Sequence, residues 1–201
     1  MKLHYRVSRW FLLALARVLW GYGRIGAENI PATGPVMIAC NHVSNWDPIL
    51  VGLGCEREIH FVAKQELFRS RFLAWLIRAF NALPVRRGVL DRTALREAAR
   101  ILQNGEVLLI FPGGGRNASG EVTDPKSGVG FIACMNETPV VPAYISGSNA
   151  LADAFLRRRR LRVAFDPAIE ATKAASADDY RELSQRVAKA IGELRREVEG
   201  A

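Results

Sequence analysis

The stretch PVMIACNHVSNWDPILVGLG, residues 35–54, is the part of the sequence that indicates the fold most directly. Its first six residues form an apolar run between Gly34 and polar Asn41, which is typical of a short buried strand. After a polar turn, DPILVGLG (47–54) has the features of a helix: an aspartate cap, a proline in the first turn and a glycine at the end. A buried strand that leads through a tight turn into a helix predicts an α/β architecture.

Segments of these two kinds alternate along the rest of the chain, without internal repeats. Further strands are predicted over residues 58–63, 83–85, 107–111, 139–145 and 161–165, and helices over 64–80, 91–105 and 176–199. The sequence therefore predicts a single layered α/β domain, with a central mostly parallel or mixed sheet flanked by helices. Ligands of such domains bind where strands run out into loops, so polar residues at strand ends are the first candidates for a site.

Two such residues stand at the two ends of the turn in the opening stretch. His42 leaves the strand and Asp47 opens the helix, so the turn can bring imidazole and carboxylate together. A carboxylate that accepts a hydrogen bond from one ring nitrogen fixes the tautomer and leaves the other nitrogen to take a proton from a hydroxyl. Two structural alternatives stay equally open: Asp47 as a plain helix cap, and His42 as a satisfied strand end.

The same turn resembles a motif of a known family. NHVSNWD (41–47) resembles the N-H-x-x-x-x-D motif of the 1-acylglycerol-3-phosphate (lysophosphatidic acid) acyltransferase family of glycerolipid acyltransferases. FNALPVRRG (80–88), IFPGGGRN (110–117) and VVPAYI (140–145) resemble the next three blocks of that family, in the family's order. One histidine–aspartate motif is weak alone, whereas four ordered blocks over residues 41–145 are specific.

The resemblance implies transfer of a fatty acyl group from acyl-CoA or acyl-carrier protein to the free hydroxyl of lysophosphatidic acid, in phospholipid synthesis. It gives His42 the role of general base on that hydroxyl, and it gives Asp47 the role of holding the imidazole and stabilising its protonated form. The acyl donor is a co-substrate, and the resemblance implies neither a cofactor nor a metal.

A phosphate on the acceptor requires cations or main-chain N–H groups. The family blocks make Arg87 and Arg116 the first candidates, with Arg86, Lys64 and Lys126 as weaker ones. In so basic a chain, the alternative for each of them is an ordinary solvated surface cation.

Three consecutive glycines, Gly113, Gly114 and Gly115, lie between an apolar strand and Arg116. Glycines let a main chain approach a phosphate or an acceptor head group closely, so this loop is predicted to bind the acceptor. The family has glutamate in place of Gly113 and threonine in place of Gly115. Loss of the carboxylate is expected to weaken acceptor binding by roughly 1.5–3 kcal/mol, and Glu121 is the nearby acid that could replace it. The departure leaves two alternatives: a different lysolipid or lipid acceptor, or a lipid-binding homologue with weakened catalysis.

Residues 1–25 are predicted to form a membrane-associating helix ahead of an acyltransferase domain at 26–201. On a helical wheel of about 100° per residue, the cations from Lys2 to Arg17 share one stripe, which Leu13 interrupts, and apolar side chains cover the far side. This pattern and the flanking tryptophans favour a helix in the membrane interface, with its cations toward the headgroups. The expected location is the cytoplasmic face of the inner or plasma membrane. The alternative is a first helix packed on the domain's own core.

The composition is that of a folded and basic protein: 201 residues, 49% hydrophobic and 24% charged, with a formal net charge of +8. It excludes a disordered chain and suits nucleic acid, an anionic membrane or phosphorylated substrates. The sequence lacks the recognition-helix and aromatic-strand patterns of nucleic-acid-binding modules, so membrane lipids are the expected partner and nucleic acid is not. The run 157–160 is interpreted as a loop that meets anionic headgroups or as a solvated turn. The three cysteines have no metal-ligand spacing and are expected to be reduced thiols.

Overall fold

The computed structural model describes residues 3–64, 68–69, 74, 77, 81–85, 92–156, 158–173 and 176–200. The strands of its single sheet are β1 (Gly23–Ile25), β2 (Val36–Cys40), β3 (Ile59–Lys64), β4 (Ala82–Val85), β5 (Val107–Ile110), β6 (Val140–Ser146) and β7 (Arg162–Phe165). The helices are α1 (Leu3–Trp20), α2 (Asp47–Gly54), α4 (Arg92–Gln103), α5 (Gly128–Met135), α6 (Leu151–Phe155) and α7 (Ala177–Gly200), with a short 3-10 helix at Ala27–Asn29.

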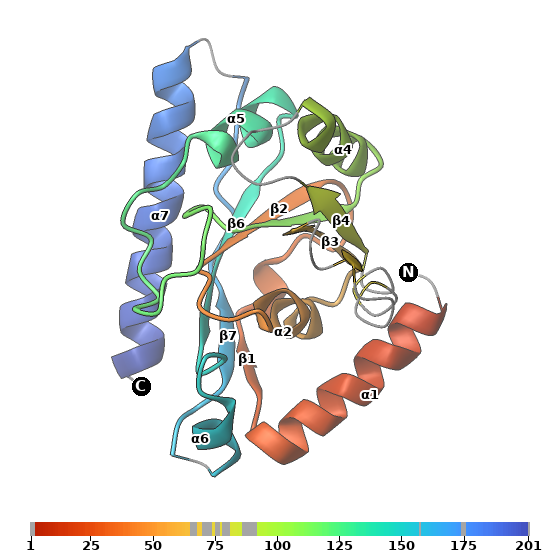
Figure 1. The fold of residues 1–201 in the computed structure, drawn as a ribbon. Coiled ribbons are helices and arrows are strands. Elements are labelled where there is room, and N and C mark those ends of the chain that lie inside the picture. Colours follow the sequence, from red (N-terminus) through yellow and green to blue (C-terminus); the bar gives the residue numbers. More distant parts are fainter. Residues whose placement is uncertain are drawn as a thin grey trace.

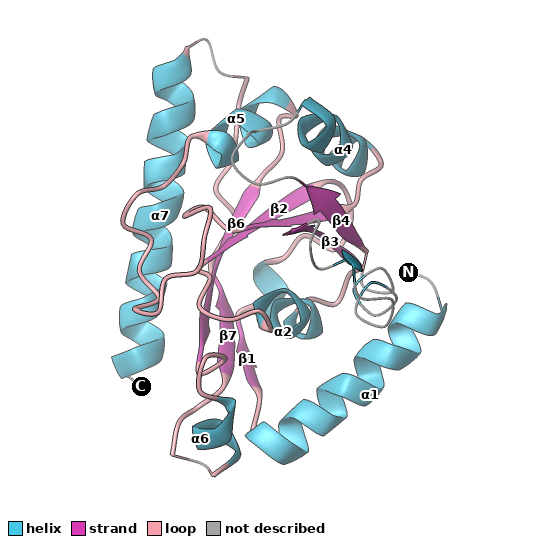
Figure 2. Ribbon diagram, viewed as in Figure 1, coloured by secondary structure: helices cyan, strands magenta, loops and turns pink. Residues whose placement is uncertain are grey.

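The sheet is mixed, and helices flank it on both faces (Figure 2). Its strand order is β1-β7-β6-β2-β5-β3-β4, and all neighbouring pairs are parallel except the antiparallel pair β6–β7. The strand of the opening stretch is the central one, and the whole of β2 is fully buried, as its uninterrupted apolar run predicts. The predicted single α/β domain with a central mixed sheet is therefore confirmed.

Side chains alternate along β2 between two separate cores. Val36, Ile38 and Cys40 pack in the core that contains residues of α1 and α2. Met37 and Ala39 pack in the core that contains residues of α4, α5 and α7. Figure 1 shows the resulting layers, with α7 along one face of the sheet and α1 and α2 beyond the other.

The predicted C-terminal helix is confirmed as α7, which buries one apolar face: Leu183, Val187, Ile191, Leu194 and Val198. The predicted helix at 91–105 appears as α4, and Gly105 follows it with a left-handed φ of 71° that suits a glycine beyond a helix end. The predicted helix at 64–80 lies mostly outside the described residues. Within it, Ala74 and Ile77 are helical and buried.

The first helix packs on the domain partly through the stripe that the sequence analysis assigned to its cations: Arg9 and Leu13 of that stripe face the protein, whereas Arg6 and Arg17 are exposed. Tyr5, Leu13 and Ala16 are buried in the core shared with α2. Arg9 is half-buried, and its Nη2 donates to the carbonyl oxygen of Leu53 across 2.9 Å. Arg9 therefore faces the protein, and its expected direction toward headgroups is wrong, because Leu13 on the same side packs into the core.

The opposite side of α1 is exposed and apolar. Its large side chains Val7, Trp10, Phe11 and Val18 have between 58% and 71% of their surface exposed. Of the helices in the described part of the chain, none combines the length and the apolar character needed to span a membrane.

Candidate active site

The site begins at the carboxyl ends of parallel strands in the middle of the sheet. His42 follows β2, Phe111 follows β5, and Lys64 is the last residue of β3. Because β2, β5 and β3 are neighbouring parallel strands, these three positions lie at one edge of the sheet.

The turn after β2 folds around the carboxylate of Asp47. Oδ2 of Asp47 lies 2.8 Å from Nδ1 of His42, and it also accepts hydrogen bonds from the main-chain N–H groups of Val43 (2.7 Å) and Ser44 (2.8 Å). Asp47 is completely buried. Since a carboxylate is an acceptor, Nδ1 of His42 carries the proton, and Nε2 is the nitrogen that can take a proton from a substrate.

Asp47 is not the helix cap that the sequence predicted. It is the first residue of α2, and Trp46 holds the cap position without a side-chain hydrogen bond. The carboxylate of Asp47 turns back toward residues 42–44, where it meets one imidazole and two main-chain donors. The alternative of Asp47 as a plain cap is therefore wrong, because these donors occupy its carboxylate.

A serine that the sequence analysis missed completes the surroundings of Asp47. The Oγ of Ser148 donates to Oδ1 of Asp47 across 2.5 Å, and Ser148 is only 2% exposed. It lies just after β6, 101 positions from its partner. Nothing near Ser148 in the sequence marks it, since its role depends on the pairing of β6 with β2.

The imidazole of His42 also has a defined plane, because Phe111 stacks on it. The two ring centroids are 4.1 Å apart, and the rings are inclined by 19°. Phe111 comes from the third block of the sequence, directly before the proline and the glycines. The Nδ1 bond and this stacking together restrict the ring in direction and in tilt.

Asn41, directly before His42, fixes the end of β2 to β6. Its side-chain amide donates to the carbonyl oxygen of Ile145 (3.0 Å), and its Oδ1 accepts from the N–H of the same residue (2.7 Å). The amide thus continues the β2–β6 hydrogen bonding by one step beyond the strand. Asn41 is 1% exposed, so it anchors the residue from which the imidazole projects.

The glycine-rich loop starts beside the stacked ring and returns to the turn. The N–H of Gly114 donates to the carbonyl oxygen of Phe111 (3.0 Å), and the N–H of Asn117 donates to that of His42 (2.7 Å). Gly113, Gly114 and Gly115 are exposed. The loop is therefore attached to the site by its main chain and presents its glycines to solvent.

Only one of the three glycines needs to be glycine in this conformation. Gly114 has a φ of 65°, in the left-handed region. A Cβ at Gly113 would meet only the carbonyl oxygen of Gly115, at 3.8 Å, and a Cβ at Gly115 would meet nothing within 4 Å. A Cβ atom therefore fits at both positions, and the chain's own packing does not account for the absence of a side chain there.

The predicted cations are only partly brought together. Arg116 is exposed at the end of the glycine-rich loop. Arg86 and Arg87 lie outside the described residues, and for Lys64 the structure describes the main chain alone. Lys126 forms an ion pair with Asp124, with Nζ and Oδ2 2.5 Å apart.

Glu121 pairs with an arginine from the far end of the chain. Its Oε1 lies 2.6 Å from an Nη of Arg195, which belongs to α7. The carboxylate of Glu121 is thus held by α7 in this conformation and does not stand in for the missing acid at Gly113.

Comparison with known proteins gives a consistent result at the level of family, sequence and structure. The family model described as Acyltransferase matches residues 24–146. A 1-acyl-sn-glycerol-3-phosphate acyltransferase of Bacillus subtilis is 32% identical over 142 residues, which are 70% of this chain and 70% of the relative. One of Streptococcus pneumoniae is 28% identical over 125 residues, 61% of this chain but only 46% of the relative. The crystal structure of the 1-acyl-sn-glycerophosphate (LPA) acyltransferase of Thermotoga maritima superimposes with a TM-score of 0.68 at 25% identity, covering 94% of this chain and 82% of that one.

Proposed function

The chain belongs to the acyltransferase family of lysophosphatidic acid acyltransferases, and from that premise we propose that it acylates the free hydroxyl of lysophosphatidic acid to give phosphatidic acid. The observation that carries this proposal is the buried contact between Nδ1 of His42 and Oδ2 of Asp47, 2.8 Å long. It would supply a general base of fixed tautomer at the carboxyl ends of β2 and β5, which the first and third family blocks follow.

In the proposed reaction, Nε2 of His42 takes the proton of the acceptor hydroxyl while the hydroxyl oxygen attacks the thioester carbonyl of the acyl donor. The carbon–sulfur bond then breaks, and the thiolate that leaves receives the proton from the imidazolium. Asp47 stabilises the imidazolium between these two steps. Base catalysis of this kind supplies about 10²–10⁴-fold, so positioning of the two substrates has to supply much of the remainder. Acyl-CoA or acyl-carrier protein serves as the donor.

The acceptor's phosphate would be bound by Arg116 and the main chain of the glycine-rich loop, with Arg87, Arg86 and Lys64 as further candidates. The support for this is that the N–H of Asn117 bonds the main chain of His42, which brings the loop and the base into direct contact. Arg116 is exposed at the same end of the loop. A phosphate held there lies beside the base without requiring a side chain at Gly113.

The exposed apolar side of α1 supports attachment to a membrane, which is where a lysolipid acceptor resides. Trp10 and Phe11 are more than half exposed on a helix whose other side packs on the domain. Helix α6, which contacts α1, exposes Phe155 at its end; Leu156 directly after it and Arg158 two positions further are exposed as well. Apolar side chains next to cations suit the interface of an anionic membrane, so we place the enzyme on the cytoplasmic face of the membrane as a peripheral protein.

A different lysolipid acceptor is the second candidate function, and Gly113 is the observation that favours it. The family's glutamate is missing there, although the space for a side chain is open. An acceptor whose head group makes no hydrogen bond to an acid at this position would lose little from this absence.

The test is to incubate the protein with palmitoyl-CoA, or with palmitoyl-acyl-carrier protein, and a panel of lysolipids, and to identify the products by mass spectrometry. We expect phosphatidic acid from lysophosphatidic acid to be the dominant product. If only another lysolipid is acylated, that lipid takes the place of lysophosphatidic acid as the acceptor. If no pair of substrates gives an acylated lipid, the proposal is contradicted.

A further inference from the structure

We propose that Arg195, near the end of α7, is a positioning residue that holds the loop of residues 113–121 in place over the general base. This inference rests on the proposed function, because that loop is where the acceptor's phosphate would bind. Arg195 is 148 positions beyond Asp47, the last residue of the histidine motif, and none of the four family blocks contains it.

The part of the loop that touches the base is a compact turn. The N–H of Asn117 donates to the carbonyl oxygen of His42 (2.7 Å), and the N–H of Gly120 donates to the carbonyl oxygen of Asn117 (3.0 Å). The side chain of Asn117 donates to the carbonyl oxygen of Glu121 (2.9 Å) and accepts from the N–H of Ser119 (3.1 Å). A displacement of Glu121 is therefore transmitted through this turn to the main chain of His42.

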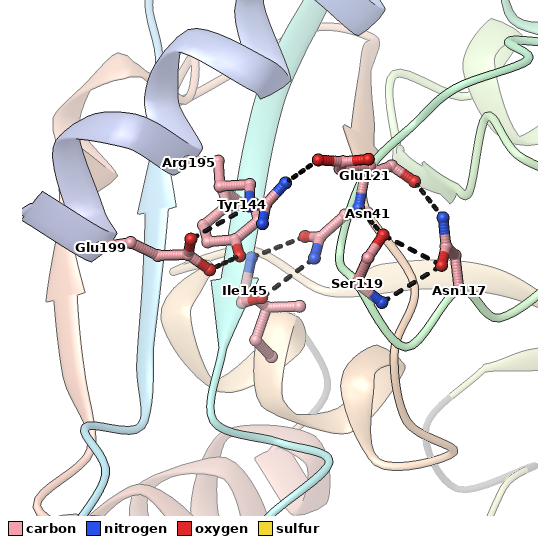
Figure 3. A network of polar contacts seen from close by, with 8 residues as sticks. All are labelled: Asn41, Asn117, Ser119, Glu121, Tyr144, Ile145, Arg195 and Glu199. Carbon is pink, nitrogen blue, oxygen red and sulfur yellow. Dashed lines mark hydrogen bonds and ion pairs between the residues drawn. The ribbon is translucent and has the colours of Figure 1, made fainter.

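Arg195 binds this turn at Glu121 and is itself hydrogen-bonded to Glu199 of its own helix. One Nη donates to Oε1 of Glu121 (2.6 Å), and Nε donates to Oε2 of Glu199, one turn further along α7 (3.0 Å). The other oxygen of Glu199 accepts from the hydroxyl of Tyr144 (2.5 Å), which is 2% exposed in β6. Figure 3 shows these contacts as one continuous network from α7 to the loop.

The network is connected to His42 both through β6 and through the loop of residues 113–121. Tyr144 precedes Ile145, and Ile145 is the residue that the amide of Asn41 binds directly before His42. The loop also comes close to Tyr144, because a Cβ at Gly120 would lie 3.0 Å from the tyrosine hydroxyl. Arg195 thus fastens the loop to the same strand that fixes the end of β2.

A single surface ion pair contributes little on its own. Arg195 differs from such a pair because two carboxylates share it and one of them is bonded to a buried tyrosine. Burial and the hydrogen bond to Glu199 raise the pKa of Tyr144, so its hydroxyl stays a donor. The hydrogen bond to Glu121 raises the pKa of the Arg195 guanidinium, which therefore keeps its charge.

The loop of residues 113–121 has much conformational freedom that an attachment can restrict. Its first part consists of exposed glycines with open space around two of them, and glycine has the most freedom to lose on ordering. The acid that the family carries at Gly113 is absent, so it cannot order the loop from that end. An attachment at Glu121, directly after the turn that touches the base, fixes the other end.

The kinetic test compares Arg195→Ala with Arg196→Ala, its neighbour on α7, whose side chain is 77% exposed and points to a different partner. We expect Arg195→Ala to raise the KM for lysophosphatidic acid several-fold, because the acceptor then has to order the loop when it binds. The KM for the acyl donor and the melting temperature should stay near those of Arg196→Ala. Glu121→Gln removes the charge from the other partner and leaves only a weaker neutral acceptor, so it should raise the same KM, but by less.

A second measurement does not depend on activity. Hydrogen–deuterium exchange of the amides in residues 113–121 should be faster in Arg195→Ala and Glu121→Gln than in the wild type and in Arg196→Ala. Equal exchange rates in all four proteins would overturn the attachment. Faster exchange with an unchanged KM for the acceptor would overturn its positioning role. If the wild type acylates no lysophosphatidic acid, the proposed function fails, while the exchange rates still decide whether Arg195 holds the loop.

Discussion

At the scale of single residues, the sequence spacing between His42 and Asp47 follows from the hydrogen bonds that the Asp47 carboxylate makes. Oδ2 of Asp47 has to reach the imidazole of His42 and also the N–H groups of the next two residues. A turn that closes on all three donors fixes how many residues separate the base from the acid. The acid is thus the centre of the turn as well as the partner of the base.

Ser148→Ala tests whether the second oxygen of Asp47 matters for catalysis. The change leaves Oδ1 of a buried carboxylate without the serine donor, which costs about 1–3 kcal/mol. We expect kcat to fall by about tenfold with both KM values little changed, because the imidazole loses part of its orientation. Steady-state kinetics measure this, with Ser146→Ala in β6 as the matched control. A kcat equal to that of the control would contradict a role for Ser148.

Gly113→Glu restores the acid of the family pattern and should be accepted by the fold. Its Cβ meets only one atom within 4 Å, the oxygen of Gly115 at 3.8 Å, so the melting temperature should not change. If lysophosphatidic acid is the acceptor, its KM should fall by about tenfold, the value of one charged hydrogen bond. Gly114→Glu is the contrasting variant, because a φ of 65° strains any residue with a side chain. A Gly113→Glu protein with a raised KM for lysophosphatidic acid would favour a different acceptor.

At the scale of elements, the sequence predicts best where burial is complete or one-sided. The strand at 35–40 was predictable because a central strand is apolar on both faces, and α7 because its buried side chains recur at helical spacing. The helix predicted for residues 1–25 ends at Trp20, and Gly23–Ile25 instead form β1, a three-residue strand that shows neither pattern. Helix α5, apolar almost throughout, was not predicted either. Ser148 and Arg195 were missed for another reason: their partners are 101 and 74 positions away, and only the folded sheet brings them together.

The two sides of α1 should respond differently to substitution. Leu13→Ala removes a buried side chain and should lower the free energy of unfolding by about 2–5 kcal/mol. Trp10→Ser with Phe11→Ser changes only exposed side chains, so it should leave stability nearly unchanged. The same double variant should bind anionic phospholipid vesicles several-fold more weakly than the wild type, since it loses apolar area that would enter the interface.

Chemical denaturation and vesicle sedimentation measure these two effects. Loss of vesicle binding in Leu13→Ala while it is still folded, or full binding by the double variant, would contradict the assignment of the exposed side to lipid. The double variant also separates attachment from catalysis, because its activity on acceptor in detergent micelles should be retained.

At the scale of the whole molecule, a layered fold with two cores surrounds one polar edge of the sheet. Its three cysteines are all inside: Cys40, Cys55 and Cys134 are buried, and burial raises the pKa of each thiol. The thiolate is the reactive form, so the native protein should react slowly with thiol reagents.

This predicts that Ellman's reagent titrates few thiols in the native protein and all three after denaturation. Rapid reaction of the native thiols would contradict their burial. Slow reaction has a practical consequence, because the same reagent can then report the coenzyme A thiol released by acyl transfer.

The most direct test of the proposed chemistry is thiol release from palmitoyl-CoA on detergent micelles, with and without lysophosphatidic acid, for the wild type and His42→Ala. We predict release that requires the acceptor and that falls by about 10²-fold or more in the variant, the contribution of a general base. Release that is independent of the acceptor, or that persists at the wild-type rate in His42→Ala, would contradict acyl transfer by the His42–Asp47 pair.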